Sequence, residues 1–183
     1  MKSLQGKFLI ATPQQLDSSF VRTVIFVVQH TEQGAFGVVV NRPASAIFRV
    51  LWQRAAKQGC SGTWQLHLGG PVTGPLMAVH GDASLGEIKV LPNVFFAAKE
   101  DHVARAMQQF LYPCKVFIGY AGWGPNQLDH ELDKGFWLVA QAPAARVFSG
   151  DENLWEEMIK EVRTSLLHTV FNIRHIPNDP LLN

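Results

Sequence analysis

Two apolar runs near the start of the chain constrain its fold more than any other feature. TVIFVVQ (Thr23–Gln29) and AFGVVVN (Ala35–Asn41) are rich in β-branched and aromatic residues and are too short for ordinary helices. The segment between them, HTEQG, has the length and the glycine of a hairpin loop. Because neither run alternates between apolar and polar positions, we expect both strands to be buried on two faces.

The rest of the chain predicts further short strands and a few helices. The predicted strands are Lys7–Thr12, Thr63–Leu68, Pro75–His80, Glu87–Leu91, Asn93–Ala98, Cys114–Tyr120 and Phe136–Ala140. Apolar residues at helical spacing predict helices over Ile47–Gln58 and Lys99–Phe110. Ser149 and Glu152 form a capping-box pattern, which predicts that the last helix begins at Ser149.

The order of these elements favours one fold class. Strands come mostly in runs and do not alternate with helices, which favours an α+β fold with a mixed sheet over a doubly wound parallel sheet. No repeat, linker or low-complexity tract interrupts the chain. We therefore predict a single domain over residues 1–183, with an irregular tail over residues 170–183 that contains two prolines.

Composition limits the classes of function. The 183 residues are 47% hydrophobic and carry 16 basic against 15 acidic side chains, for a net charge of +1. A chain of this size buries a core without disulfides or metals, and its balanced charge supplies no footprint for DNA or an anionic membrane. The short apolar run near the N-terminus does not suit a signal peptide or a membrane span. We expect a cytoplasmic monomer or homodimer with neither DNA nor a membrane as its partner.

The stretch FIGYAGWGPNQLDHEL (Phe117–Leu132) raises the question of a phosphate loop. Gly119, Gly122 and Gly124 lie between a predicted strand and a predicted helix, where backbone amides bind phosphate in other proteins. However, no GK[ST] follows, the G-x-x-G-x-G spacing is not the dinucleotide fingerprint, and three carboxylates occupy the helix. We therefore interpret these glycines as positions that let the chain approach bulky rings such as Trp123 closely.

The short helix after the glycines has its own ambiguity. Pro125 suits its first position. Asp129 and Asp133 are four residues apart, and like charges at this spacing cost a few tenths of a kcal/mol. A divalent cation held with His130 would relieve this repulsion, whereas an exposed face balanced by Lys134 needs no ligand. We favour the exposed face and predict no metal.

No sequence motif indicates catalysis. The seven histidines show neither HxH nor HExxH spacing, and no serine lies in a GxSxG elbow. Cys60 and Cys114 form no CxxC pair and are interpreted as buried or idle thiols. We therefore predict no catalytic residues, no metal and no cofactor.

Polar and glycine residues at predicted strand ends are candidate ligand contacts. Arg42 follows a buried strand, and its guanidinium suits a carboxylate or phosphate. A turn in which Asn41 bonds the backbone and Arg42 pairs with an acid would explain the same residues. The candidate ligand-binding set is Asn41, Arg42, Gly69, Gly70, His80 and Trp123.

Several strings together resemble the YqgE/AlgH family of bacterial proteins. They are GKFLIATP, HTEQGAFGVVVNRP, LGGPV, GYAGW followed by QLDHEL, and ENLWEEM. The resemblance runs from about Gly6 to Leu167, with departures at Pro125–Asn126 and Asp129. It implies a compact α+β fold of bent mixed β-sheets flanked by about three to four helices, and it brings no catalytic residues to transfer. Some members are labelled transcriptional regulators.

Three classes of function remain open. We favour a non-enzymatic binding or regulatory protein with an unknown protein or small-molecule partner, because no nucleophile and base can be paired. The alternative is an enzyme or small-ligand binder whose site is assembled from Arg42, His80 and the Trp123 loop at the strand ends. A transcriptional regulator would rest on the family label alone, since no helix-turn-helix or basic helix is legible.

Overall fold

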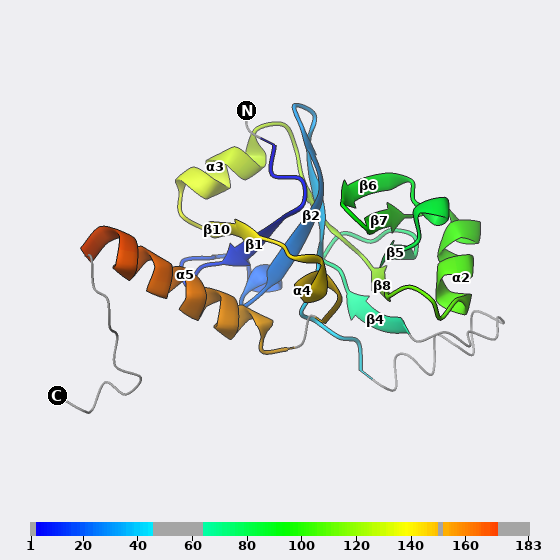
Figure 1. Ribbon diagram of the computed structural model, residues 1–183. Helices are drawn as coiled ribbons and strands as arrows, with labels where there is room; N and C mark the ends of the chain where they lie inside the picture. Colours follow the sequence, from blue (N-terminus) through cyan, green and yellow to red (C-terminus); the bar gives the residue numbers. More distant parts are fainter. Residues whose placement is uncertain (1–2, 46–63, 150–151, 172–183) are drawn as a thin grey trace.

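The computed structural model describes residues 3–45, 64–149 and 152–171, and this part of the chain forms two five-stranded sheets (Figure 1). The first sheet has the order β10-β1-β2-β3-β9, and all neighbouring strands in it are antiparallel. Its strands are β1 (Lys7–Ala11), β2 (Val24–Thr31), β3 (Gly34–Val39), β9 (Ala121–Trp123) and β10 (Trp137–Gln141).

The second sheet has the order β4-β8-β5-β7-β6 and is mixed, because β4 and β8 are parallel while its other pairs are antiparallel. Its strands are β4 (Trp64–Leu68), β5 (Met77–His80), β6 (Ile88–Leu91), β7 (Val94–Ala97) and β8 (Cys114–Ile118). The described helices are α2 (Glu100–Gln108), α3 (Gln127–Asp133), α4 (Ala144–Ser149) and α5 (Leu154–Phe171), with short 3-10 turns at Ser18–Phe20 and Ala83–Leu85. The predicted α+β class is confirmed.

Apolar side chains fill three layers, one between the sheets and one on the outer face of each sheet. In β2, Phe26 points into the layer between the sheets, whereas Ile25 and Val27 point into the layer beneath α3. In β8, Phe117 enters the layer between the sheets and Val116 enters the layer beneath α2. Accordingly, α3 and α2 lie at opposite sides of the molecule in Figure 1. The expected burial of β2 and β3 on two faces is confirmed.

Several predicted boundaries were wrong. The hairpin loop is shorter than HTEQG, because Thr31 pairs with Gly34 and leaves a two-residue turn. Pro125 precedes the helix, since Asn126 is the N-cap of α3 with a left-handed φ of 61°. The helix predicted over Ile47–Gln58 lies outside the described residues, as does the tail beyond Phe171, where α5 ends.

The predicted start of the last helix was also wrong. Ser149 ends α4, and its hydroxyl donates to the carbonyl of Arg146 at 3.5 Å. The last helix, α5, begins at Leu154, where the carbonyl of Asn153 accepts from Glu157 N at 3.1 Å. Its Trp155 indole donates to the carbonyl of Ala11 at 2.7 Å, which holds the helix on β1. The start of α5 is therefore set by the contact of Trp155 with β1 and by the end of α4, and not by the capping-box pattern of Ser149 and Glu152.

The sheets are joined where two glycine-containing turns touch. Gly69 N donates to the carbonyl of Ile118 at 2.8 Å, and Val72 and Tyr120 exchange two backbone hydrogen bonds of 3.0 Å. Gly70 has φ +151°, and a Cβ there would overlap the carbonyl carbon of Tyr120. Only a residue without a side chain fits at this junction.

We predict that Gly70→Ala lowers the free energy of unfolding by about 3 kcal/mol, because it combines backbone strain with a clash against the Tyr120 backbone. Gly124→Ala is the matched control, since a Cβ there meets only the Gln127 amide oxygen at 3.9 Å. The control should stay within about 0.5 kcal/mol of the parent. Urea unfolding curves measure both, and equal losses in the two variants would contradict the steric argument.

Candidate functional site

The glycine stretch after β8 leads into a nest of aromatic rings around one carboxylate. Trp123 and Trp137 both donate their indole N–H to Glu131 Oε2, at 2.9 and 2.7 Å. The two indoles meet edge to face at 6.0 Å between centroids, and Phe20 packs against both. Gln127 donates to the other oxygen of Glu131 at 3.0 Å. These contacts hold the carboxylate beneath the rings.

A hollow of about 330 Å³ opens beside these rings and is called the Trp123 hollow here. Phe20, Trp123 and Phe136 line it as aromatic groups. The charged residues in its lining, Asp17 and Glu131, are both acidic. The hollow therefore combines aromatic walls with polar groups and negative charge.

A second hollow of about 470 Å³ adjoins it and is called the Arg42 hollow. Pro71 and Val72 line both hollows, so the two adjoin, and together they are called the groove. Leu68 and Val72 line this hollow with 45% and 39% of their surfaces exposed, so they offer apolar contact to a ligand. Arg42 is the charged residue among those that line it.

The Arg42 guanidinium is held by backbone carbonyls. Its Nη1 donates to Ser19 O at 2.5 Å and its Nη2 donates to Val21 O at 3.0 Å. Within residues 3–45, 64–149 and 152–171, no carboxylate pairs with Arg42, although an acid partner was one expectation. Burial lowers the pKa of this guanidinium below its ordinary value. A partly buried cation with spare donors therefore faces the hollow.

The other candidates lie in different surroundings. Asn41 is buried, where its side chain accepts from Val24 N at 2.8 Å and donates to Arg22 O at 3.0 Å, so it joins the end of β3 to the start of β2. Gly69 packs its backbone against Gly119. Gly70 lines the Arg42 hollow, and Trp123 lines its neighbour.

His80 does not join this groove. It is fully buried on β5, on the face that packs against α2, because Ala78 two residues earlier belongs to that layer. Neither ring nitrogen has a hydrogen-bond partner in the part of the chain that the structure describes. Burial lowers the pKa of His80, while the nearby charge of Asp82 opposes this shift. The structure thus brings Arg42 and Trp123 to adjoining hollows and separates His80 from them.

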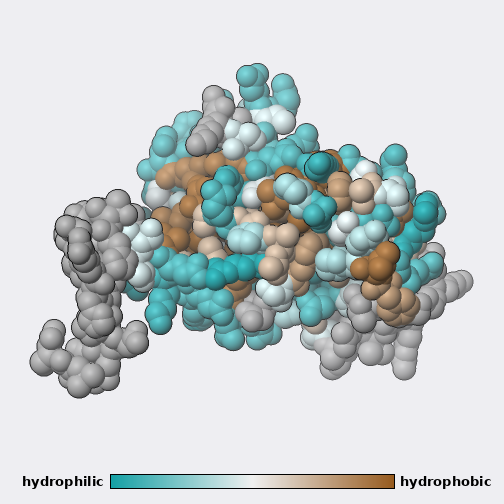
Figure 2. Space-filling view, viewed as in Figure 1, coloured by the Kyte–Doolittle hydropathy of each residue, from teal (hydrophilic) through white to brown (hydrophobic). Residues whose placement is uncertain are grey.

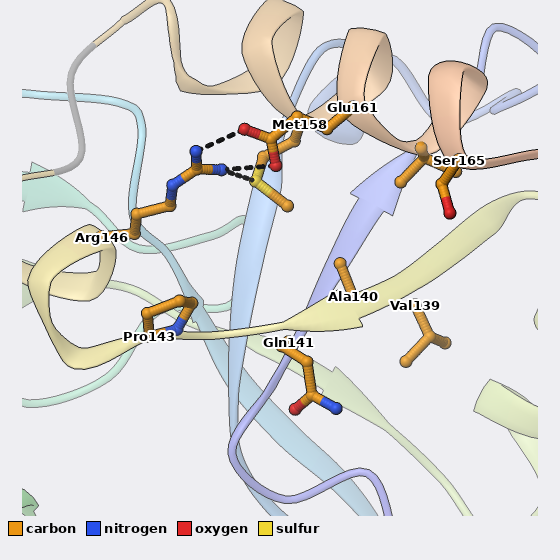
Figure 3. Close-up of a pocket in the computed structure, with 9 residues that line it drawn as sticks. Val139, Ala140, Gln141, Pro143, Arg146, Met158, Glu161 and Ser165 are labelled. Carbon is orange, nitrogen blue, oxygen red and sulfur yellow. Dashed lines mark hydrogen bonds and ion pairs between the residues drawn. The ribbon is translucent and has the colours of Figure 1, made fainter. Parts of the chain in front are cut away.

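A hollow of about 570 Å³ between β10 and α5 provides a contrast (Figure 3). Its Arg146 is paired with Glu161 of α5 and also donates to Met158 Sδ at 2.8 Å. Figure 2 shows apolar surface between α3 and α5, where β10 is the outer strand and Val139 is 42% exposed. Because the arginine here already has its counterion, this hollow lacks the unpaired charge found at Arg42.

Three further expectations concern the two cysteines, a metal ion and a membrane-spanning helix. Burial raises the pKa of the Cys114 thiol to about 12, which keeps it protonated, whereas Cys60 lies outside the described residues. Among the described residues, no group of three or more His, Cys, Asp or Glu side chains suits a metal ion. No helix in the same part of the chain combines the length and apolarity needed to cross a membrane.

Sequence reasoning missed most of the groove. Asp17 and Phe20 belong to the segment before β2, where the sequence predicts no site, and Glu131 is one of the three carboxylates on the predicted short helix. A local signal existed at Asp17, whose carboxylate accepts from Ser19 N at 2.8 Å in a turn typical of Asp-Ser pairs. That signal predicts a turn, but it does not predict which distant residues pack beside the turn.

Comparison with known proteins agrees with this architecture. A family model described as AlgH-like matches residues 8–167. The chain belongs to the AlgH-like family. Among its relatives, a UPF0301 protein of Rhizobium meliloti is 38% identical over 162 residues, which cover 81% of this chain and 80% of the relative. A UPF0301 protein of Chlorobium luteolum is 35% identical over 163 residues, covering 85% and 84% of the two chains.

Solved structures extend the AlgH-like match to three dimensions. The solution structure of the AlgH protein from Pseudomonas aeruginosa is similar with a TM-score of 0.68 and 27% identity, over 96% of this chain and 97% of that one. A crystal structure of a protein from Corynebacterium diphtheriae has a TM-score of 0.67 over 88% and 87% of the two chains. At 22% identity, this second match shows the fold alone.

The buried His80 predicts a loss of stability in mild acid. Burial lowers its pKa in the folded state, so the unfolded chain binds the proton first as the pH falls. The free energy of unfolding should therefore decrease below about pH 6.5, by at most about 1.4 kcal/mol per pH unit for this one group.

Urea unfolding between pH 7.5 and 5 measures this slope. His80→Leu should flatten it, because leucine at this position binds no proton. An unchanged slope in His80→Leu would show that another group carries the pH dependence.

Proposed function

We propose that this protein is a non-enzymatic binding protein whose ligand carries a carboxylate that pairs with Arg42. The observation that supports this proposal is the partly buried guanidinium, which has no carboxylate partner in the described residues and lines a hollow of about 470 Å³. That volume lies within the usual range of small-molecule sites. An incoming anion would supply the missing countercharge.

The surroundings of Arg42 favour a carboxylate with an apolar body. Val21 O and Ser19 O orient the planar guanidinium, which suits two-point binding of a carboxylate. The exposed Leu68 and Val72 supply apolar contact beside it. One positive charge in a largely apolar hollow matches a singly charged ligand better than a phosphate, which carries up to two charges.

The same lining favours binding over catalysis. The hydroxyl groups that face the Arg42 hollow come from Ser19 and Thr73, and none of the described residues that line it is a His, Cys, Lys, Asp or Glu that could act as a general base. His80, which the enzyme interpretation requires beside Arg42, lies beneath α2 instead. A ligand held here would therefore be retained and released unchanged.

We expect hexanoate to bind to the protein and hexanamide, its neutral counterpart, to bind at least about tenfold more weakly. A hydrogen bond to a charged group contributes about 1.5–3 kcal/mol, and 1.4 kcal/mol is a tenfold change in Kd. Arg42→Met should lose the preference for hexanoate, and Arg42→Lys should retain part of it. Isothermal titration calorimetry measures both ligands with the parent and with each of the two variants.

Lys134→Met, which removes an exposed cation next to α3, is the matched control and should bind hexanoate as the parent does. Equal affinity for hexanoate and hexanamide, or full hexanoate binding by Arg42→Met, would overturn the proposal. Thermal unfolding of each variant verifies that the domain remains folded without the hydrogen bond from Arg42 to the Ser18–Phe20 turn, η1.

A further inference from the structure

We propose that the whole groove binds a short free peptide, with the peptide's C-terminal carboxylate on Arg42 and its N-terminal ammonium in the Trp123 hollow. The carboxylate end rests on the proposed function. The Trp123 hollow would bind the other end of the same ligand.

The two ends of the groove carry opposite charges. Among the described residues, the charged ones that line the Trp123 hollow are Asp17 and Glu131, and the charged one that lines the Arg42 hollow is Arg42. Pro71 and Val72 border both hollows, so one elongated ligand can contact both ends. A zwitterion with its charges at opposite ends is complementary to this arrangement.

The acidic end is built to receive an ammonium group. Phe20 and Trp123 stack with their ring planes 16° apart, and both line the hollow together with Phe136. Aromatic rings attract cations, and these three rings form walls of the hollow. The Glu131 carboxylate is held in place by two indole N–H groups, and Asp17 uses Oδ1 to accept from Ser19 N. In the described part of the chain, Asp17 Oδ2 makes no hydrogen bond and is left for the ligand.

Gln15 adds a donor that distinguishes a peptide from a simple amino acid. Its Oε1 accepts from Asp17 N at 3.1 Å, which orients the amide. Its Nε2 is buried in the lining of the Trp123 hollow and has no partner among the described residues. Because an unsatisfied buried donor is unfavourable, a peptide carbonyl near the bound ammonium is a fitting acceptor.

The middle of the groove favours apolar side chains. Val72 and Leu68 are exposed here, and Leu16 at the rim of the Trp123 hollow is 83% exposed. Apolar residues of a peptide that crosses Pro71 and Val72 would cover these surfaces. An internal segment of a protein lacks both terminal charges, so a free peptide fits the groove better.

The test uses trileucine, N-acetyl-trileucine and trileucine amide, with binding followed by calorimetry and by tryptophan fluorescence at pH 7. We expect trileucine to bind at least tenfold more tightly than either capped peptide, because each cap removes one terminal charge. Asp17→Asn should weaken trileucine about fivefold and leave N-acetyl-trileucine unchanged. Asparagine preserves the turn at this position, since its side chain caps as well as that of aspartate. Asp101→Asn, at an exposed position of α2, is the matched control and should change neither affinity.

The possible outcomes separate the two proposals. Equal binding of trileucine and N-acetyl-trileucine, together with Arg42-dependent binding of hexanoate, would overturn the peptide proposal and leave the proposed function standing. Equal binding of trileucine and its amide would overturn the peptide proposal, because the peptide carboxylate would then not need Arg42, while the proposed function is decided separately by whether hexanoate binding depends on Arg42. A fivefold loss that Asp17→Asn shows for trileucine alone would support the ammonium site.

Discussion

The backbone of Gly69 and Gly70 lies directly against the backbone of Gly119 and Tyr120, and this contact sets how the two sheets meet. The chain passes there from β8 in one sheet to β9 in the other, while Val39 N donates to Gly69 O at 2.8 Å and so ties β3 to the end of β4. Side chains at these glycines would push the segments apart. Gly70 and Gly119 also line the Arg42 hollow, so the junction that joins the sheets shapes the candidate site.

The charges of the groove are held in place by groups that do not neutralise them. Backbone carbonyls orient Arg42, and indole N–H groups orient Glu131. Because its side chains are already ordered before binding, such a site loses little conformational entropy when a ligand binds. Arg146 shows the opposite arrangement, because Glu161 already supplies its counterion. Among the described residues, Arg42 therefore differs from Arg146 in lacking a carboxylate partner, although the hollow that Arg146 lines is the larger of the two.

Sequence patterns predicted strands and helices correctly where the pattern depends only on residues within that strand or helix. The apolar runs around Phe26 and Val38 predicted strands buried on two faces, and the apolar spacing near Val103 predicted α2. β9 was missed because it has only three residues, one of them glycine, and exists through its pairing with β3. The helix start at Ser149 was wrong because α4 ends there, which a local capping pattern cannot reveal.

The sequence by itself determined the strands, the fold class, the resemblance to a family and Arg42 as a cation that follows a buried strand. Only the tertiary structure decided that Asp17, Arg42, Val72 and Glu131 border one groove, because these residues come from segments far apart in the chain. It also decided that His80 lies elsewhere, since the alternation of side chains along β5 directs it toward α2. Spacing along a chain encodes local periodicity, whereas a binding groove depends on how distant segments pack.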